Sequence, residues 1–146
     1  GAERIVLMDA DGQHDPKEIP LFLEDLDKGF RIVFGVRRLE KGMPKWRMAG
    51  NTFLRWVTNY LFEIDLNDVW CGYRVFDAKI YKKIIWDSSD YSSDVEMVVN
   101  VARNGYLYGE RFVGTIYHDK VSMTGTTLHD GLKLLIDLVL WRFKIT

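Results

Sequence analysis

One stretch near the start of the chain decides the fold: IVLMDADGQHDP, residues 5–16. Its first four residues form a continuously apolar run, which is typical of a parallel β-strand buried on both faces. Asp9 and Asp11 follow at the expected carboxyl end of that strand. Asp15 precedes a proline and, three residues on, a glutamate, the pattern of a capping box at a helix start. We therefore expect a buried strand, an acidic loop and a helix in succession.

The segments that follow continue this alternation of strands and helices. The first helix is expected to extend to Lys28 and to stop at Gly29. A strand–helix–strand order predicts a right-handed crossover in a parallel or mixed sheet, and therefore an α/β fold. The later elements predicted from periodicity and turn residues are strands at 31–35, 69–76 and within 106–117 (one long strand or a pair), and helices at 46–62, 78–85, 93–103 and 128–143.

Composition narrows the class of protein. A chain of 146 residues that is 47% hydrophobic predicts one compact core, and a formal charge of −1 removes the overall attraction expected of a nucleic-acid binder. The lone Cys71 cannot form an internal disulfide, and the three histidines form no zinc pattern with it. No run of eighteen apolar residues and no signal-peptide pattern occur, so the expected compartment is the cytoplasm.

The acidic loop is a candidate metal site. An extended backbone sends residues i and i+2 to the same side, so the carboxylates of Asp9 and Asp11 are expected to converge. Hard oxygen ligands suit Mg²⁺ or Mn²⁺ shared with substrate phosphates, and Gln13 could add a neutral oxygen.

Three other interpretations compete with a metal site. In a capped turn, the two aspartates would only accept hydrogen bonds from backbone amides. An EF-hand is excluded because its glycine and glutamate positions hold His14 and Pro20. A phosphatase of the haloacid-dehalogenase type also places Asp-x-Asp-Gly after an apolar strand. Against it, Gln13 stands where that family has threonine, and no later Gly-Asp-x-x-x-Asp motif follows.

The opening stretch closely resembles the metal-binding segment of family 2 glycosyltransferases, especially the dolichol-phosphate mannosyltransferase and polyprenyl-phosphate glycosyltransferase group. The resemblance continues through FGVR (34–37), DVWCGYRVF (68–76), DVEM (94–97) and Gly105, and so covers nearly the whole chain. It implies part of a GT-A fold and the inverting, metal-dependent transfer of a hexosyl unit. The donor would be a nucleotide-diphosphate sugar and the acceptor a dolichyl or polyprenyl phosphate.

The resemblance also implies roles for individual residues. Asp9, Asp11 and Gln13 would be the metal ligands, and Asp9, Asp11 and Arg37 would form the catalytic set. The donor side would use Asp9, Asp11, Asp68 and Gly72. The acceptor phosphate would be bound by Arg37, Arg47, Asn51 (where a serine is common), Arg74 and Lys120. The last of these would replace an arginine that precedes the family's Gly-x-Ser signature, here Gly125-Thr126-Thr127.

These residue types suit the chemistry. A divalent cation stabilises the charge that develops on a departing nucleotide, and planar guanidinium groups bind phosphate oxygens in pairs. A lipid phosphate is already an anionic nucleophile, so no general base is required. On the helix predicted at 46–62, the residues at spacing four (Arg47, Asn51, Arg55 and Asn59) form a polar stripe opposite an aromatic face. Such a stripe either serves the site or is an ordinary solvated face.

Several single residues have plainer interpretations. Gly72 either admits the close approach of a ligand or allows a bulge. Glu96 is expected to cap or pair structurally, and Cys71 to be a small core or pocket residue. His14 is expected at the surface or in a loop.

The chain is expected to resemble the family only after the N-terminal third, which holds the nucleotide base in family members. Residues 1–126 would form the metal- and acceptor-binding portion and 127–146 an amphipathic helix that packs on the domain or lies on the cytoplasmic face of a membrane. A sheet edge left open would favour self-association. The alternative is a non-catalytic fragment that binds lipid phosphate or protein.

Overall fold

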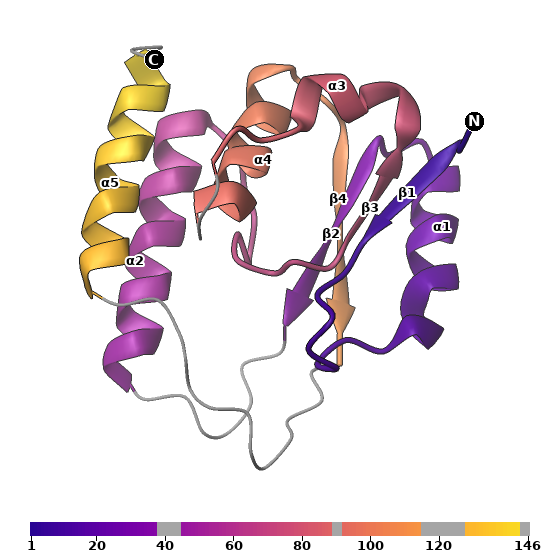
Figure 1. The fold of residues 1–146 in the computed structure, drawn as a ribbon, viewed down its shortest axis with the longest axis horizontal. Coiled ribbons are helices and arrows are strands. Elements are labelled where there is room, and N and C mark those ends of the chain that lie inside the picture. Colours follow the sequence, from indigo (N-terminus) through magenta and orange to yellow (C-terminus); the bar gives the residue numbers. More distant parts are fainter. Residues whose placement is uncertain (38–44, 89–91, 115–127, 144–146) are drawn as a thin grey trace.

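The computed structural model describes residues 1–37, 45–88, 92–114 and 128–143 (Figure 1). These residues form a four-stranded sheet in the order β1-β3-β2-β4. β3 is antiparallel to both neighbours, and β2 and β4 are parallel. The sheet is therefore mixed, which confirms the predicted α/β class. The strands are β1 (Arg4–Leu7), β2 (Ile32–Arg37), β3 (Arg74–Asp77) and β4 (Tyr108–Val113).

Helices cover both faces of the sheet. In Figure 1, α1 lies on one face, and α4, α2 and α5 lie on the other, with α2 and α5 side by side. Neighbouring residues of β2 alternate between the two layers, because Val33 packs with the α1 side and Phe34 with the α2–α4–α5 side. The helices are α1 (Ile19–Asp27), α2 (Lys45–Phe62), α3 (Tyr81–Ile84), α4 (Ser92–Arg103) and α5 (Leu128–Phe143), with 3-10 turns at Pro16–Glu18 and Ala78–Ile80.

Two strand predictions need correction. The first strand is not buried on both faces: in the described sheet β1 pairs with β3 alone, antiparallel, and its side chains alternate between exposed and half-buried. The strand predicted at 69–76 begins only at Arg74, because residues 69–73 follow an irregular path at the site described below. Of the two alternatives for 106–117, one strand or a pair, the described part shows one strand, β4, and residues 115–117 lie outside the described ranges.

The capping box is only partly confirmed. Asp15 is the N-cap, and its carboxylate accepts the backbone N–H of Lys17 at 2.9 Å. Glu18, however, does not complete the box; its Oε1 accepts the backbone N–H of Gly114 at 2.9 Å. Glu18 thereby links the start of α1 to the end of β4, a tertiary contact that local spacing does not reveal.

α5 exposes more large apolar side chains than it fully buries. Leu134 and Leu138 are buried in the core cluster that also contains Phe34 of β2. The exposed large apolar residues of α5 are Leu132, Ile136, Val139, Leu140 and Phe143. One face of α5 thus packs on the domain while the other is open. No helix in the described ranges is both long enough and apolar enough to cross a membrane.

Candidate functional site at the carboxyl edge of the sheet

The topology gathers three chain segments at one edge of the sheet. β3 runs antiparallel between β1 and β2, with Arg74 opposite both Leu7 and Phe34. The segment before β3 therefore lies beside the residues that follow β1 and end β2 (Figure 1). Residues 68–73, the acidic loop and Arg37 consequently meet at the carboxyl edge of β1 and β2.

Asp9 lies directly against Gly72. A Cβ atom on Gly72 would come within 2.6 Å of Oδ2 and 2.7 Å of Oδ1 of Asp9, so only glycine leaves room for this carboxylate. The Asp9 side chain is still 61% exposed and lies 3.7 Å from Nε2 of His14. Contact with His14 lowers the pKa of Asp9, and partial burial opposes that shift. Asp9 is thus an accessible, ionised carboxylate at the edge of the site.

His14 corrects a prediction, because it is buried rather than at the surface. It is 8% exposed, and its ring centroid lies 5.1 Å from that of Tyr73. The Tyr73 ring in turn packs against Phe22 of α1, 4.6 Å between centroids. His14 is buried because the acidic loop folds back over Tyr73, which places Nε2 beside Asp9.

Asp11 does not lie on an extended backbone as expected. Regular strand geometry ends at Leu7, residues 10–12 form a turn, and Gly12 has φ +79°. Oδ1 of the exposed Asp11 accepts the backbone N–H of Gln13 at 2.9 Å, the geometry of an Asx turn. This hydrogen bond is the one that the capped-turn interpretation requires, and it involves one of the two carboxylate oxygens of Asp11.

The donor set of the acidic loop is small. Among the residues that the structure describes, no three His, Cys, Asp or Glu side chains gather in a way that could hold a metal ion. Two accessible aspartates beside an amide side chain still match the hard oxygen donors that Mg²⁺ and Mn²⁺ take, provided that a substrate supplies further oxygens. The loop thus fits a shared ion and not a cage made by the protein alone.

Arg37 and Asp68 form a bidentate ion pair. Nε of Arg37 donates to Oδ2 of Asp68 at 2.7 Å, and its terminal nitrogen donates to Oδ1 at 3.0 Å. Oδ1 also accepts the backbone N–H of Trp70 at 3.0 Å. The side chains of Asp68 and Arg37 are 12% and 30% exposed. Asp68 therefore fixes the plane of the Arg37 guanidinium near the site surface.

Arg74 has the position of a structural residue. Its guanidinium is 2% exposed and donates to the carbonyls of Cys71, Asp94 and Val69. It also lies 3.1 Å from Oδ1 of Asp94. The expectation that Arg74 binds the acceptor phosphate has no support in this geometry, because the burial that hides the group from solvent also hides it from a ligand.

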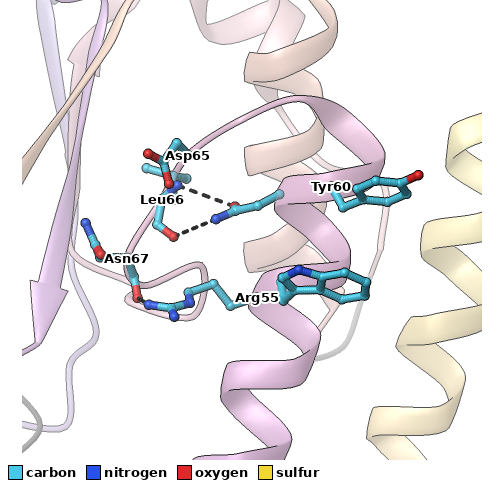
Figure 2. A pocket seen from close by; sticks show the side chains of 7 residues that line it. Arg55, Tyr60, Asp65, Leu66 and Asn67 are labelled. Atoms are coloured by element: carbon cyan, nitrogen blue, oxygen red, sulfur yellow. Dashed lines mark hydrogen bonds between the residues drawn. The ribbon is translucent and has the colours of Figure 1, made fainter.

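The polar stripe on α2 holds a loop in place. Arg55 donates to the carbonyl of Asn67 at 3.2 Å, and the side-chain amide of Asn59 donates to the carbonyl of Leu66 at 2.9 Å (Figure 2). A pocket of about 360 Å³ lies between this loop and α2, lined by Arg55, Trp56, Asn59, Tyr60, Asp65, Leu66 and Asn67. The interpretation of the stripe as an ordinary solvated face is therefore wrong for Arg55 and Asn59.

The aromatic side of α2 points away from the core. Trp56 and Tyr60 are 60% and 72% exposed and stack on each other at 5.6 Å, and the exposed Phe53 stacks on Trp56 at 6.5 Å. An apolar surface made of three aligned rings is unusual on a solvated face.

The other predicted residues divide into placed and undescribed ones. Cys71 is buried, and burial raises its pKa to about 11, so it is an inert core thiol. Glu96 accepts the backbone N–H groups of Asp87 and Ser88, a structural role as expected. Asn51 lies half-buried on α2. The side chain of Arg47, and residues Lys120 and Gly125-Thr126-Thr127, lie outside the described part.

The comparisons with known proteins agree with this arrangement. The structure matches glucosyl-3-phosphoglycerate synthase from Mycobacterium tuberculosis, solved with uridine diphosphate, with a TM-score of 0.69 at 12% identity. The match covers 98% of this chain and 50% of that one. The fold is therefore part of the GT-A glycosyltransferase fold, as expected.

The sequence then specifies the family. The family model for glycosyl transferase family 2 matches residues 2–88, more than half of the chain, and the chain belongs to that family. This family assignment excludes the alternative of a haloacid-dehalogenase-type phosphatase.

Two named relatives indicate the branch of the family. The chain is 31% identical over 113 residues to undecaprenyl-phosphate mannosyltransferase of Micrococcus luteus, covering 72% of this chain and 46% of that protein. It is 27% identical over 147 residues to UDP-N-acetylglucosamine–dolichyl-phosphate N-acetylglucosaminyltransferase of Methanococcus voltae, covering 96% and 59%. The chain thus spans about half the length of these relatives.

A test of the Asp9–Gly72 contact follows. Gly72→Ala should displace the Asp9 carboxylate at little cost in stability, because the backbone of Gly72 has no positive φ and a side-chain end can rotate away. We expect a change of less than about 1 kcal/mol in the free energy of unfolding in urea, with a clear shift of the Asp9 carboxyl ¹³C signal.

Gly35→Ala is the matched control. Its Cβ would meet the Tyr73 carbonyl and the Cys71 sulfur at 2.9 Å each, and these groups cannot rotate away. This variant should lose about 1 to 3 kcal/mol, the usual cost of overpacking. An unchanged Asp9 signal in Gly72→Ala would show that the carboxylate does not lie against Gly72.

Proposed function

We propose that the protein transfers a hexosyl unit from a nucleotide-diphosphate sugar to a dolichyl or polyprenyl phosphate, with inversion and with Mg²⁺ or Mn²⁺ as cofactor. The observation that carries this proposal is the juxtaposition of the Asp9 carboxylate with the oriented Arg37 guanidinium at one sheet edge. The family and the lipid-phosphate substrates in the names of the two relatives support it.

In this proposal, the acidic loop serves the donor. Asp9, Asp11 and Gln13 would hold the cation, with the remaining ligands coming from the donor phosphates. The bound cation would supply electrostatic stabilisation of the leaving nucleotide. Gly72 leaves the Asp9 carboxylate in place to face the cation, because a larger side chain there would occupy the space of that carboxylate.

Arg37 serves the acceptor in this proposal. Asp68 holds its guanidinium in one plane, and a lipid phosphate would bind this oriented guanidinium in exchange for one of its present partners. Arg47, Asn51 and Lys120 are further proposed contacts. An anionic phosphate oxygen needs no general base. It would attack the anomeric carbon as the bond from that carbon to the nucleotide diphosphate breaks, and a single displacement of this kind inverts the anomeric configuration.

We also propose that the outer faces of α2 and α5 rest on the cytoplasmic side of a membrane. The exposed rings of Trp56 and Tyr60 combine an apolar body with a polar tip, a combination suited to the headgroup region. On α5, Ile136 and Phe143 are 55% and 69% exposed, and the half-exposed Arg142 adds positive charge. A lipid acceptor would then reach the site from the surface on which the protein lies.

Self-association is a further part of the proposal. β1 is an edge strand in the described sheet, paired on one side by β3. An open strand edge offers backbone groups to a second chain.

The catalytic proposal predicts that Asp9→Asn or Asp11→Asn reduces sugar transfer to polyprenyl phosphate at least about tenfold, a barrier increase of about 1.4 kcal/mol. The reason is the loss of a charged oxygen donor for the cation. Radiolabelled sugar transfer at fixed Mg²⁺ measures the effect, with Asp27→Asn, an exposed aspartate on α1, as the matched control.

Retained transfer in both variants would refute the assignment. Calorimetry separates the alternative of a non-catalytic fragment, because that fragment would bind lipid phosphate without metal-dependent binding of a nucleotide sugar.

The membrane proposal predicts that the protein floats with liposomes, more strongly when anionic lipid is present. Ile136→Ser combined with Phe143→Ser should reduce the bound fraction about tenfold or more, because two exposed apolar side chains that would enter the membrane interface are lost. Leu107→Ser, at a leucine that is 60% exposed between α4 and β4, is the matched control. Absence of flotation with either lipid composition would exclude membrane docking.

A further inference from the structure

Glu110 of β4 holds the residue that precedes Asp68. Oε1 of Glu110 accepts the backbone N–H of Asn67 at 2.6 Å, and Oε2 accepts its side-chain Nδ2–H at 2.7 Å. One carboxylate thus fixes both the main chain and the side chain of Asn67. Because Asn67 is bonded directly to Asp68, this contact limits how far the Asp68 carboxylate can move.

The loop that carries Asn67 is hydrogen-bonded to two side chains of β4, those of Tyr108 and Glu110. The hydroxyl of Tyr108 accepts the backbone N–H of Asp65 at 2.8 Å. Tyr108 and Glu110 are two residues apart in a strand and so point to the same face, and their partners Asp65 and Asn67 are also two residues apart. The loop therefore runs along the side chains of β4 in a fixed register.

The two members of the Arg37–Asp68 pair are held by two adjacent strands, β2 and β4. Arg37 belongs to β2, and β2 pairs in parallel with β4, with Phe34 opposite Glu110. Asp68 is tied to β4 through Asn67 and Glu110. The pairing of β2 with β4 therefore sets the position of the carboxylate relative to the guanidinium.

We propose that Glu110 is a positioning residue for acceptor-phosphate binding: it holds Asn67, which fixes Asp68, which orients Arg37. The inference rests on the proposed role of Arg37. A bidentate pair is directional, so a displaced Asp68 leaves the guanidinium in several orientations and makes phosphate binding less favourable.

The structural link is tested by hydrogen exchange in the 146-residue chain. Glu110→Ala should speed exchange at the Arg37 Nε–H and at the Trp70 N–H, both of which donate to Asp68, by about threefold or more. Glu110→Gln keeps one acceptor oxygen for Asn67, so its exchange rates should lie between those of the unaltered chain and those of Glu110→Ala. Glu24→Ala, at an exposed position on α1, should leave both rates unchanged. Unchanged exchange in Glu110→Ala, or in Asn67→Ala if the former does not fold, overturns the inference.

The functional link is tested by kinetics. Glu110→Ala should raise the KM for polyprenyl phosphate about three- to tenfold, with the donor KM unchanged, since one or two hydrogen bonds are lost. In an Asp68→Asn background the same substitution should add less than about twofold, because its effect passes through Asp68.

A general structural effect would instead lower kcat and change the KM values of both donor and acceptor, and it would persist in the Asp68→Asn background. That result overturns the positioning role. Faster exchange with an unchanged acceptor KM also overturns that role. This result would show that Glu110 positions Asp68 but that Arg37 does not bind the acceptor phosphate.

Discussion

Arg74 donates hydrogen bonds inside the protein to the carbonyls of Val69, Cys71 and Asp94, and it lies beside the Asp94 carboxylate. A buried guanidinium is tolerated only where its donors are satisfied, so the chain before β3 must wrap around it. This wrapping explains why residues 69–73 are irregular. Asp68 directly precedes the wrapped segment and Gly72 lies within it, so a structural charge determines where both site residues lie.

The antiparallel strand β3 completes the site. A strand that runs opposite to its two neighbours brings its own start to the edge where both neighbours end. Asp68 therefore meets Arg37 after β2, and Gly72 meets Asp9 after β1. A wholly parallel sheet would place the segment before β3 at the opposite edge. The candidate donor and acceptor residues are close together because of this one reversal.

Local sequence patterns predicted most elements and fewer of the contacts. Helix periodicity located α2, α4 and α5, and the N-cap Asp15 located the start of the first helix, since these depend on nearby residues. Strand neighbours depend on distant residues, so an apolar run could not show that β1 is an edge strand. The family resemblance selected Asp9, Arg37 and Asp68 together. It did not show that Arg37 pairs with Asp68 or that Asp9 lies against Gly72, because these contacts depend on the tertiary fold.

The sequence did not predict side-chain roles correctly where a polar residue, usually found at the surface, is buried by residues distant in sequence. The family resemblance implied that Arg74 binds the acceptor phosphate, yet its side chain is enclosed in the protein. His14 is a loop residue as expected, but its burial was missed because the residue that covers it, Tyr73, is distant in sequence. Glu110 gave only one signal, its spacing of two from Tyr108 in a predicted strand, and that spacing does not identify a partner 43 residues away.

The central claim is that the acidic loop binds a divalent cation beside Gly72. Mn²⁺ titrated into the ¹⁵N-labelled chain, alone and with uridine diphosphate, tests it through paramagnetic broadening of amide signals. We expect the signals of Ala10, Gln13 and Gly72 to disappear first, that of Gly29 at the far end of α1 to persist, and the selectivity to vanish in Asp9→Asn. Broadening that is uniform, or centred on another part of the chain, would contradict the account.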